Sequence, residues 1–332
     1  MKVVTILVPE GVVLAAIADP RYLFTAVNQF LVSQGKEELF DVKLVGLRKD
    51  VHLNDGLFSV HPDWLVGDAK YSDLIIVPAL SGDLQASLEM NKDFLPWIVA
   101  QHQKGAEVAS LCIGAFLLAA TGLLEGKYCS THWLFANQFR TMFPVSILVD
   151  DKIITEQNGI YTSGGASSYW NLLLYLVEKY VSREMAILAA KFFALDIGRN
   201  GQSAFVIFTG QKEHGDAQVR QAQEFIETHY QDKIHVEDIA DKVGLGRRTF
   251  ERRFKKATTN SVMEYIQRVK MEAVKKQLES SHKSVSELMY EVGYTDSKAF
   301  RDVFRKITGI SPNDYRNKYN KRTFVVGADF AG

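Results

Sequence analysis

The sequence predicts an α/β domain with a parallel sheet, followed by an all-α domain. Three observations predict these two parts. A chain of 332 residues has about twice the usual length of one domain. Short apolar runs alternate with helical patterns in the first 195 residues, and a helical unit of about 50 residues occurs twice after residue 217. The composition, with 47% hydrophobic and 23% charged residues, excludes a wholly disordered or collagen-like chain.

Cysteine content and hydropathy exclude several other classes. Two cysteines are too few for a disulfide framework or a four-ligand zinc site, so we expect a reducing compartment and neither a metal nor another cofactor. The nearly uncharged residues 108–124 fall short of the roughly 18 to 20 apolar residues of a membrane helix. Residues 1–9 are apolar but lack a small-residue cleavage site, and we interpret them as a first strand. We therefore expect a cytoplasmic protein with no membrane partner.

The charge is balanced over the whole chain but uneven along it. The chain has 39 basic and 39 acidic residues, yet residues 215–322 contain 22 Lys and Arg against 16 Asp and Glu. This excess suits a domain that binds a polyanion, but solvated helix faces would produce a similar excess. Motifs have to decide between the two interpretations.

Residues 1–195 are expected to form the α/β domain, a sandwich of the flavodoxin-like type. Helical patterns at residues 22–32 and 94–103 lie between apolar runs that predict strands at residues 3–8, 42–47, 74–80 and 108–112. In a parallel sheet of this kind, ligands bind beyond the carboxyl ends of the strands. Three segments of small residues follow strand-like runs and predict the ligand site: Ser81-Gly82-Asp83, Cys112-Ile113-Gly114 and Ser163-Gly164-Gly165.

Cys112 lies at an abrupt strand-to-helix turn in a pattern that resembles a nucleophile elbow. At a helix N-terminus, unpaired backbone N–H groups and the helix dipole favour the thiolate over the thiol. His132, twenty residues later, supplies an imidazole that would face the sulfur as a Cys–His pair. We favour a ligand-site or redox-sensitive thiol, and a working nucleophile and an inert buried cysteine stay open. For His132 the alternative is a hydrogen-bonded structural histidine, and Cys129 is interpreted as packing.

This region resembles the PfpI and ThiJ-like branch of the glutamine-amidotransferase-like superfamily over roughly residues 1–195. The elbow, residues 118–124 and Thr131-His132-Trp133 carry the resemblance. It implies an enzyme or, in the branch fused to regulatory domains, a sensor. Residues 15–20 read Ala-Ala-Ile-Ala-Asp-Pro where the family often has Asp before a Gly-Pro pair, and Asn171 replaces an Asp that often follows the double glycine. These departures count against catalysis.

The second part of the chain contains an internal repeat. Residues 236–244 match residues 285–293, and the match continues after one inserted residue. Each copy predicts a short helix, a turn at Gly244 or Gly293, and a second helix with Phe at positions i and i+4, which is a helix-turn-helix unit. Capping-box spacing is found at Ser261, Ser284 and Ser311, and residues 261–278 predict one long connecting helix.

The second helix of each unit is rich in basic residues. Arginine recognises guanine edges with two hydrogen bonds, and Lys and Arg also neutralise phosphates. A rigid connector would hold the two helices about 34 Å apart, one turn of a duplex. Asp296 is either a helix cap or a base reader, and a solvated face is the alternative for any single residue. We expect six residues to contact double-stranded DNA: Arg247, Arg248, Arg252, Ser297, Lys298 and Arg301.

Residues 218–322 resemble the AraC/XylS-type DNA-binding domain, through residues 293–306 and 309–316. Leu288-Met289 departs from the usual Ile-Ala of that family, which is a packing change. Residues 196–217 are expected to be a linker, and within them residues 199–205 resemble the segment that joins PfpI-like and AraC-type domains in regulators.

We therefore hypothesise a transcriptional regulator whose first domain senses a small, polar or nitrogen-containing effector. The family resemblance further implies a homodimer. The alternatives are a cysteine-dependent hydrolase or amidase-like enzyme fused to a DNA-binding domain, and an architectural DNA binder whose first domain is degenerate. No catalytic residue is assigned, and the expected effector site comprises Cys112, His132, Ser81, Gly82, Gly164 and Gly165.

Overall fold

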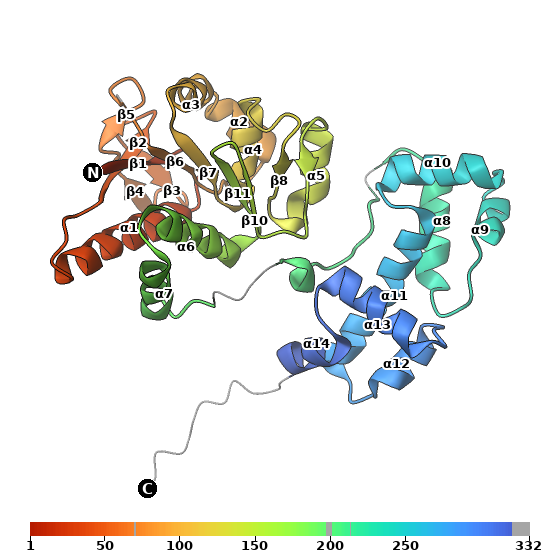
Figure 1. The fold of residues 1–332 in the computed structure, drawn as a ribbon. Coiled ribbons are helices and arrows are strands. Elements are labelled where there is room, and N and C mark those ends of the chain that lie inside the picture. Colours follow the sequence, from red (N-terminus) through yellow and green to blue (C-terminus); the bar gives the residue numbers. More distant parts are fainter. Residues whose placement is uncertain (70, 197–200, 213, 321–332) are drawn as a thin grey trace, which may run out of the picture. The chain divides into compact units, whose positions relative to one another are not determined.

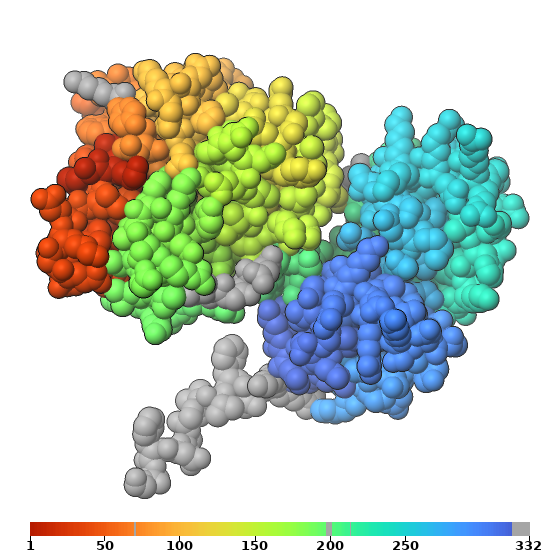
Figure 2. All heavy atoms as spheres, viewed as in Figure 1, coloured from red at the N-terminus to blue at the C-terminus, as the bar shows by residue number. Residues whose placement is uncertain are grey.

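The computed structural model describes residues 1–69, 71–196, 201–212 and 214–320. The chain divides into unit 1, Met1–Gln202, and unit 2, Ser203–Gly332 (Figure 1). Residues 197–200 and 213 of the expected linker, and residues 321–322 of the expected DNA-binding domain, lie outside the described residues. In the space-filling view, the side chains of each unit pack into a dense body of their own (Figure 2).

A seven-stranded sheet runs through unit 1 in the order β10–β11–β7–β6–β1–β2–β5. Its strands are β1 Lys2–Val8, β2 Phe40–Gly46, β5 Trp64–Leu65, β6 Leu74–Val77, β7 Glu107–Ser110, β10 Ile154–Gln157 and β11 Ile160–Ser163. All neighbouring strands are parallel except β10, which pairs antiparallel with β11. The predicted parallel α/β sheet is confirmed, with an antiparallel strand added at one edge.

Helices α1, α6 and α7 lie on one face of this sheet, and α2, α3 and α4 lie on the other (Figure 1). The helices of unit 1 are α1 Ala15–Ser33, α2 Leu84–Met90, α3 Phe94–Gln103, α4 Ala115–Ala120, α5 Ala136–Met142, α6 Tyr169–Tyr180 and α7 Arg183–Phe192. Short 3-10 turns are η1 Cys112–Gly114, η2 Trp133–Phe135 and η3 Ala166–Ser168. Two small strand pairs join β3 Val51–Leu53 to β4 Phe58–Val60 and β8 Tyr128–Cys129 to β9 Ile147–Leu148.

Central strands β1 and β6 are covered on both sides, which explains why β6 is wholly apolar and β1 is apolar except for Lys2 and Thr5. Two predicted strands are shorter than expected. The strand at residues 74–80 ends at Val77, because Pro78 has no N–H group for the ladder. The strand at residues 108–112 ends at Ser110, because Cys112 takes a positive φ of 55° and begins η1.

Unit 2 consists of two helix-turn-helix modules joined by one long helix. Module 1 contains α8 Ala217–Thr228, α9 Val236–Lys242 and α10 Arg247–Thr258. Module 2 contains α12 Val285–Glu291, α13 Ser297–Thr308 and α14 Pro312–Tyr319, and α11 Val262–Ser280 connects the modules. Each module has its own apolar core, centred on Phe250 and Phe254 or on Phe300 and Phe304. The predicted repeat is confirmed.

Side-chain caps begin the helices where the repeat requires them. Ser261 with Glu264 and Ser284 with Glu287 form reciprocal capping boxes, which satisfy backbone N–H groups at the starts of α11 and α12. Asp296 accepts hydrogen bonds from the N–H groups of residues 298 and 299. Of the two roles considered for Asp296, the structure gives it that of a cap on α13.

Residues 203–212, which we call the arm, pack on unit 2. They begin with the turn η4 Ser203–Phe205, which lies against α13. The backbone N–H of Phe208 donates to Glu272 at 3.1 Å, and the Phe208 ring meets the ring of Tyr265 edge-on. The arm therefore belongs to the body of unit 2 rather than to a free tether.

None of the described helices has the length and apolar character needed to cross a membrane. Within the same residues there is no group of three or more His, Cys, Asp and Glu side chains placed to hold a metal ion.

Gly114 offers a test of how the elbow is packed. A Cβ atom at this position would lie 2.4 Å from the Val77 carbonyl oxygen and 2.5 Å from that of Pro78, both of them backbone atoms. Gly114→Ala should therefore destabilise unit 1 by about 1–3 kcal/mol or more. Gly67→Ala is the control, since nothing lies within 4 Å of a Cβ there. Urea unfolding of the two variants measures the difference, and equal stability would show that the close approach is relieved.

Candidate effector site and nucleic-acid interface

Cys112 is held at the carboxyl edge of the sheet by two polar side chains. Its backbone N–H donates to Ser163 Oγ at 3.2 Å, and its carbonyl oxygen accepts from Thr131 Oγ1 at 3.1 Å. Ser163 ends β11 and Thr131 precedes η2, so three segments that are distant in sequence meet at the elbow. The positive φ of Cys112 is the strained geometry that such a turn requires.

The thiol of Cys112 is not activated. Its side chain is only 5% exposed, and burial raises its pKa to about 11, although a hydrogen bond from the Ile113 backbone opposes the rise. The thiol is thus protonated near pH 7. The backbone at this turn favours the thiolate, as expected, but the desolvation of the buried sulfur outweighs that contribution.

His132 acts as a cap for η2. Its Nδ1 accepts a hydrogen bond from the Leu134 backbone N–H at 3.1 Å, and burial lowers its pKa. A neutral imidazole that accepts at Nδ1 carries its proton on Nε2, so Nε2 is a donor and not a base. Among the described residues no hydrogen bond joins His132 to Cys112. The structural alternative for His132 therefore fits better than the Cys–His pair.

The double glycine lies between His132 and a residue that the sequence analysis did not single out. A Cβ on Gly165 would lie 3.6 Å from His132 Cδ2, and a Cβ on Gly164 would lie 2.8 Å from the side-chain amide of Gln202. Gln202 is 1% exposed; its Oε1 accepts from the Gly165 N–H at 2.9 Å, and its Nε2 donates to the Thr131 carbonyl at 2.9 Å. A side chain at Gly164 would therefore displace the Gln202 amide, whereas Gly165 is in ordinary contact with the His132 ring.

Asp19 and Tyr169 complete the surroundings of the elbow. The Tyr169 hydroxyl donates to Asp19 Oδ2 at 2.6 Å, across 150 positions of sequence. Burial raises the pKa of Tyr169, and the hydrogen bond to Asp19 and the neighbouring Cys112 raise it further. The sequence analysis noted Asp19 only as part of a departure from the family pattern, and it missed Tyr169. Tyr169 thus lies near the elbow, and Asp19 is its hydrogen-bond acceptor.

Ser81 and Gly82 lie at the carboxyl end of β6 and have a local role. The Ser81 hydroxyl and backbone N–H both donate to the Gly11 carbonyl, at 2.7 and 2.8 Å. Gly82 has a positive φ of 77°, as the turn into α2 requires. These bonds tie the loop after β6 to the loop after β1. Among the described residues no hydrogen bond connects Ser81 or Gly82 to Cys112.

In module 1, burial of Phe250 and Phe254 turns the basic face of α10 to solvent. Arg248 and Arg252 are exposed, and among the described residues neither has an ion pair. Arg247 differs, because it forms ion pairs with Glu237 and Glu251. Arg253, outside the six expected contacts, forms a two-pronged ion pair with Asp216, the cap of α8. The free cations of α10 therefore include Arg248 and Arg252.

Module 2 repeats this arrangement on α13. Burial of Phe300 and Phe304 leaves Ser297, Lys298 and Arg301 exposed. Among the described residues, neither Lys298 nor Arg301 has an ion pair with an acidic side chain. The N-terminal half of each second helix thus presents two free cations, which is the part of the helix that helix-turn-helix proteins place against base edges.

Comparisons with known proteins match both halves of the chain. A family model described as the DJ-1/PfpI family matches residues 6–179, and a model described as a helix-turn-helix domain matches residues 239–318. The HTH-type transcriptional regulator GbdR of Pseudomonas aeruginosa is 23% identical over 274 residues, which cover 81% of this chain and 72% of that protein. The isonitrile hydratase of Pseudomonas putida is 31% identical over 121 residues, 36% of this chain and 51% of the enzyme.

Among solved structures, a transcriptional regulator protein from Vibrio parahaemolyticus has a TM-score of 0.52 at 23% identity, and it covers 57% of this chain and 98% of that one. This likeness shows a shared fold. The helix-turn-helix domain is of the AraC type, and it follows a family match that spans more than half of the chain. The chain therefore belongs to the DJ-1/PfpI family, in the group of AraC-family transcriptional regulators that carry this domain at the N-terminus.

Proposed function

We propose that unit 1 binds a small polar or nitrogen-containing effector beside Cys112, and that this binding changes the affinity of the helix-turn-helix modules for DNA. The proposal includes action as a homodimer. An effector shifts DNA affinity only if it interacts with different free energies in two arrangements of the protein. The single observation that carries the proposal is the position of Gln202, because its side chain is held in unit 1 and the next residue begins the arm of unit 2.

Only two positions of sequence separate Gln202, at the expected effector site, from Ala204, which is hydrogen-bonded to module 2. Its amide bonds to Thr131 and Gly165, and both of these residues adjoin Cys112 or His132. Two positions later, the Ala204 carbonyl accepts a hydrogen bond from the hydroxyl of Tyr319 at the end of α14. An effector that moves the Gly165 loop would therefore change the bonds of the residue from which the arm begins.

Binding without turnover suits the chemistry of the site. A nucleophilic cysteine needs a thiolate and usually a basic neighbour. Burial raises the pKa of the Cys112 thiol to about 11, and Nδ1 of His132 accepts a hydrogen bond from a backbone N–H. The likeness to an isonitrile hydratase is the observation that favours an enzyme, which we keep as the second candidate. The site residues that we propose for effector contact are Cys112, His132, Gly164 and Gly165, with Ser81 and Gly82 at the neighbouring strand end.

For DNA we propose contacts from both modules. Four exposed cations have no intramolecular ion pair in the described structure: Arg248, Arg252, Lys298 and Arg301. These side chains can therefore bind DNA without first breaking an ion pair. Ser297 adds a hydroxyl at the start of α13. Arg247 must break its ion pairs with Glu237 and Glu251 before it can bind DNA, so we expect it to contribute least to DNA affinity among the six residues.

Effector coupling is tested by measuring the DNA affinity of the full chain against a panel of small polar metabolites. We expect at least one compound to shift the DNA dissociation constant by fivefold or more, the range of ordinary allosteric coupling, without being consumed. Gln202→Ala should bind that compound but lose most of the shift, whereas Gln34→Ala, which removes an exposed amide, should keep it.

The enzyme candidate makes the opposite prediction in the same assay. Consumption of the compound by the wild type, abolished by Cys112→Ser and without a change in DNA affinity, would contradict the sensor proposal.

Groove contacts are tested with the double variant Arg248→Ala, Arg252→Ala. Each lost phosphate contact should lower the slope of log affinity against log salt by about one, and each lost base contact should cost about 1–3 kcal/mol. Fluorescence anisotropy over a salt series measures both quantities. Arg220→Ala on α8, an exposed arginine outside the second helices, is the control. Unchanged affinity and slope in the double variant would contradict the assignment of α10.

A further inference from the structure

Helix α11 serves two cores, and the change from one to the other occurs at a single residue. Val262, Tyr265, Ile266 and Val269 pack in the core of module 1. Met271, Val274 and Leu278 pack in the core of module 2. Lys270 lies between these two sets and is only 7% exposed. Burial of a lysine costs folding free energy unless its ammonium group is hydrogen-bonded.

The partners of Lys270 come from both modules. Its Nζ donates to the Asp232 carbonyl in the α8–α9 loop at 3.2 Å, and to the Val292 carbonyl at the end of α12 at 2.7 Å. The second acceptor is at a helix C-terminus, where carbonyl groups carry partial negative charge. Burial lowers the pKa of Lys270, and the charge of Asp232 opposes this change. The ammonium group therefore links the two modules through backbone atoms.

Close packing surrounds this link on one side. A Cβ on Gly293, the turn glycine of module 2, would lie 2.8 Å from the Gln231 carbonyl and 3.2 Å from Lys270 Nζ. The positive φ of 76° at Gly293 belongs to the same turn. The turn of module 2 and the α8–α9 loop of module 1 thus approach each other at Lys270.

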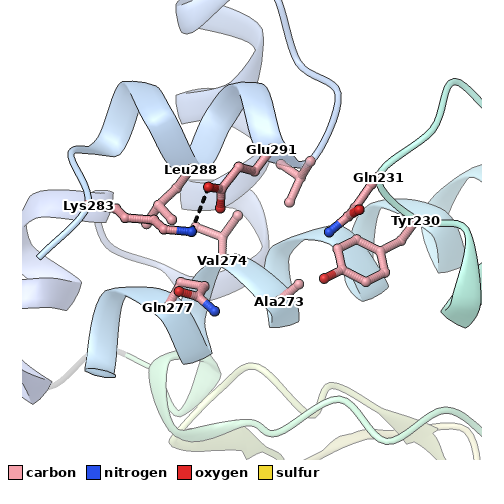
Figure 3. Close-up of a pocket in the computed structure, with 9 residues that line it drawn as sticks. Tyr230, Gln231, Ala273, Val274, Gln277, Lys283, Leu288 and Glu291 are labelled. Carbon is pink, nitrogen blue, oxygen red and sulfur yellow. Dashed lines mark hydrogen bonds and ion pairs between the residues drawn. The ribbon is translucent and has the colours of Figure 1, made fainter. Parts of the chain in front are cut away.

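On the other side the modules are separated by a crevice of about 330 Å³. Figure 3 shows Val274 and Gln277 of α11 along its floor, Tyr230 and Gln231 at one end, and the ion pair of Lys283 with Glu291 at the other. Among the described residues, Tyr230 alone packs against both apolar cores of unit 2. The crevice leaves the modules without close packing on this side, whereas the hydrogen bonds of Lys270 join them on the other.

We propose that Lys270 is a positioning residue for DNA recognition, which fixes the spacing and angular phase of α10 and α13 by tying the α8–α9 loop to the end of α12. The proposal rests on the proposed use of both helices on one duplex. Two linked binding elements gain affinity only when their geometry matches the spacing of their sites. One inserted base pair moves a half-site by about 3.4 Å and rotates it by about 35°, so a rigid joint should make binding steeply dependent on spacing.

The test uses duplexes built from a bipartite site that the wild-type full chain selects from a random library. One or two base pairs are inserted between the half-sites or removed. We expect the wild type to lose affinity about tenfold or more for one base pair of change. Lys270→Met replaces the ammonium group by an unbranched apolar side chain that is one atom shorter and donates no hydrogen bonds. This variant should bind the selected spacing about tenfold more weakly than the wild type and lose less than threefold in affinity on insertion.

Lys275 provides the matched control. It is the other buried lysine of α11, 3% exposed, and its Nζ bonds to Glu272 and to the Val206 carbonyl of the arm rather than across the modules. Lys275→Met also removes a buried charge, yet it should keep the spacing dependence of the wild type. A similar loss of spacing dependence in Lys275→Met would overturn the proposal.

Two further outcomes separate this proposal from the one on which it rests. A wild type whose affinity does not depend on spacing would overturn both the joint and the two-helix contact. If the affinity of the wild type depends steeply on spacing and that of Lys270→Met depends on it equally steeply, the proposed role of Lys270 is overturned and the two-helix contact stands. If Lys270→Met fails to fold by circular dichroism, Lys270→Arg replaces it, since its longer, planar head should shift or broaden the preferred spacing. An unchanged preference in that variant would overturn the proposal.

Discussion

Burial of a phenylalanine pair on each second helix is the constraint on which DNA recognition depends. Phe250 with Phe254, and Phe300 with Phe304, are enclosed in the two small cores of unit 2. Since residues four apart share one face of a helix, these rings fix which side of α10 and α13 faces inward. The opposite sides face solvent, and among the described residues four of their cations have no ion pair: Arg248, Arg252, Lys298 and Arg301. Helix α11 then determines how far apart the two basic faces lie.

Desolvation plays the corresponding part in unit 1. The strand-to-helix turn at Cys112 has the backbone strain of a nucleophile elbow, but burial of the sulfur opposes ionisation. His132 is committed to a backbone N–H, and Tyr169 is committed to Asp19. A protonated thiol beside an imidazole that is held by a backbone N–H suits the proposed binding of a ligand better than nucleophilic attack. Function on a shared fold depends on the groups at the site, which is why these pKa shifts and hydrogen bonds bear on the choice between sensor and enzyme.

Local sequence patterns predicted most of unit 2. The Phe pairs, the serine caps and the turn glycines are patterns that span only a few residues. The repeat makes them easier to recognise, because they occur in both copies. The strand positions of unit 1 followed from apolar runs, although Pro78 and Cys112 ended two strands earlier than periodicity suggested. A short edge strand, β10, lies antiparallel because a tight turn joins it to β11, which hydropathy alone does not reveal.

The residues that the sequence analysis missed act through tertiary contacts. Gln202 lies in a segment with the composition of a linker, and its burial depends on contacts with Thr131 and Gly165, which are distant in sequence. Asp19 and Tyr169 are 150 positions apart. Lys270 lies in the predicted connecting helix, and the sequence analysis did not single it out. Its hydrogen-bond partners lie in the α8–α9 loop and at the end of α12, so no pattern within α11 could have identified them.

The central claim is that two basic helices, held by one connector, bind neighbouring turns of the same duplex. Hydroxyl-radical footprinting of the full chain on its selected DNA site tests this claim most directly. The account predicts two protected patches on one face of the DNA, with centres about 10 base pairs apart. A single protected patch, or two patches on opposite faces, would contradict it.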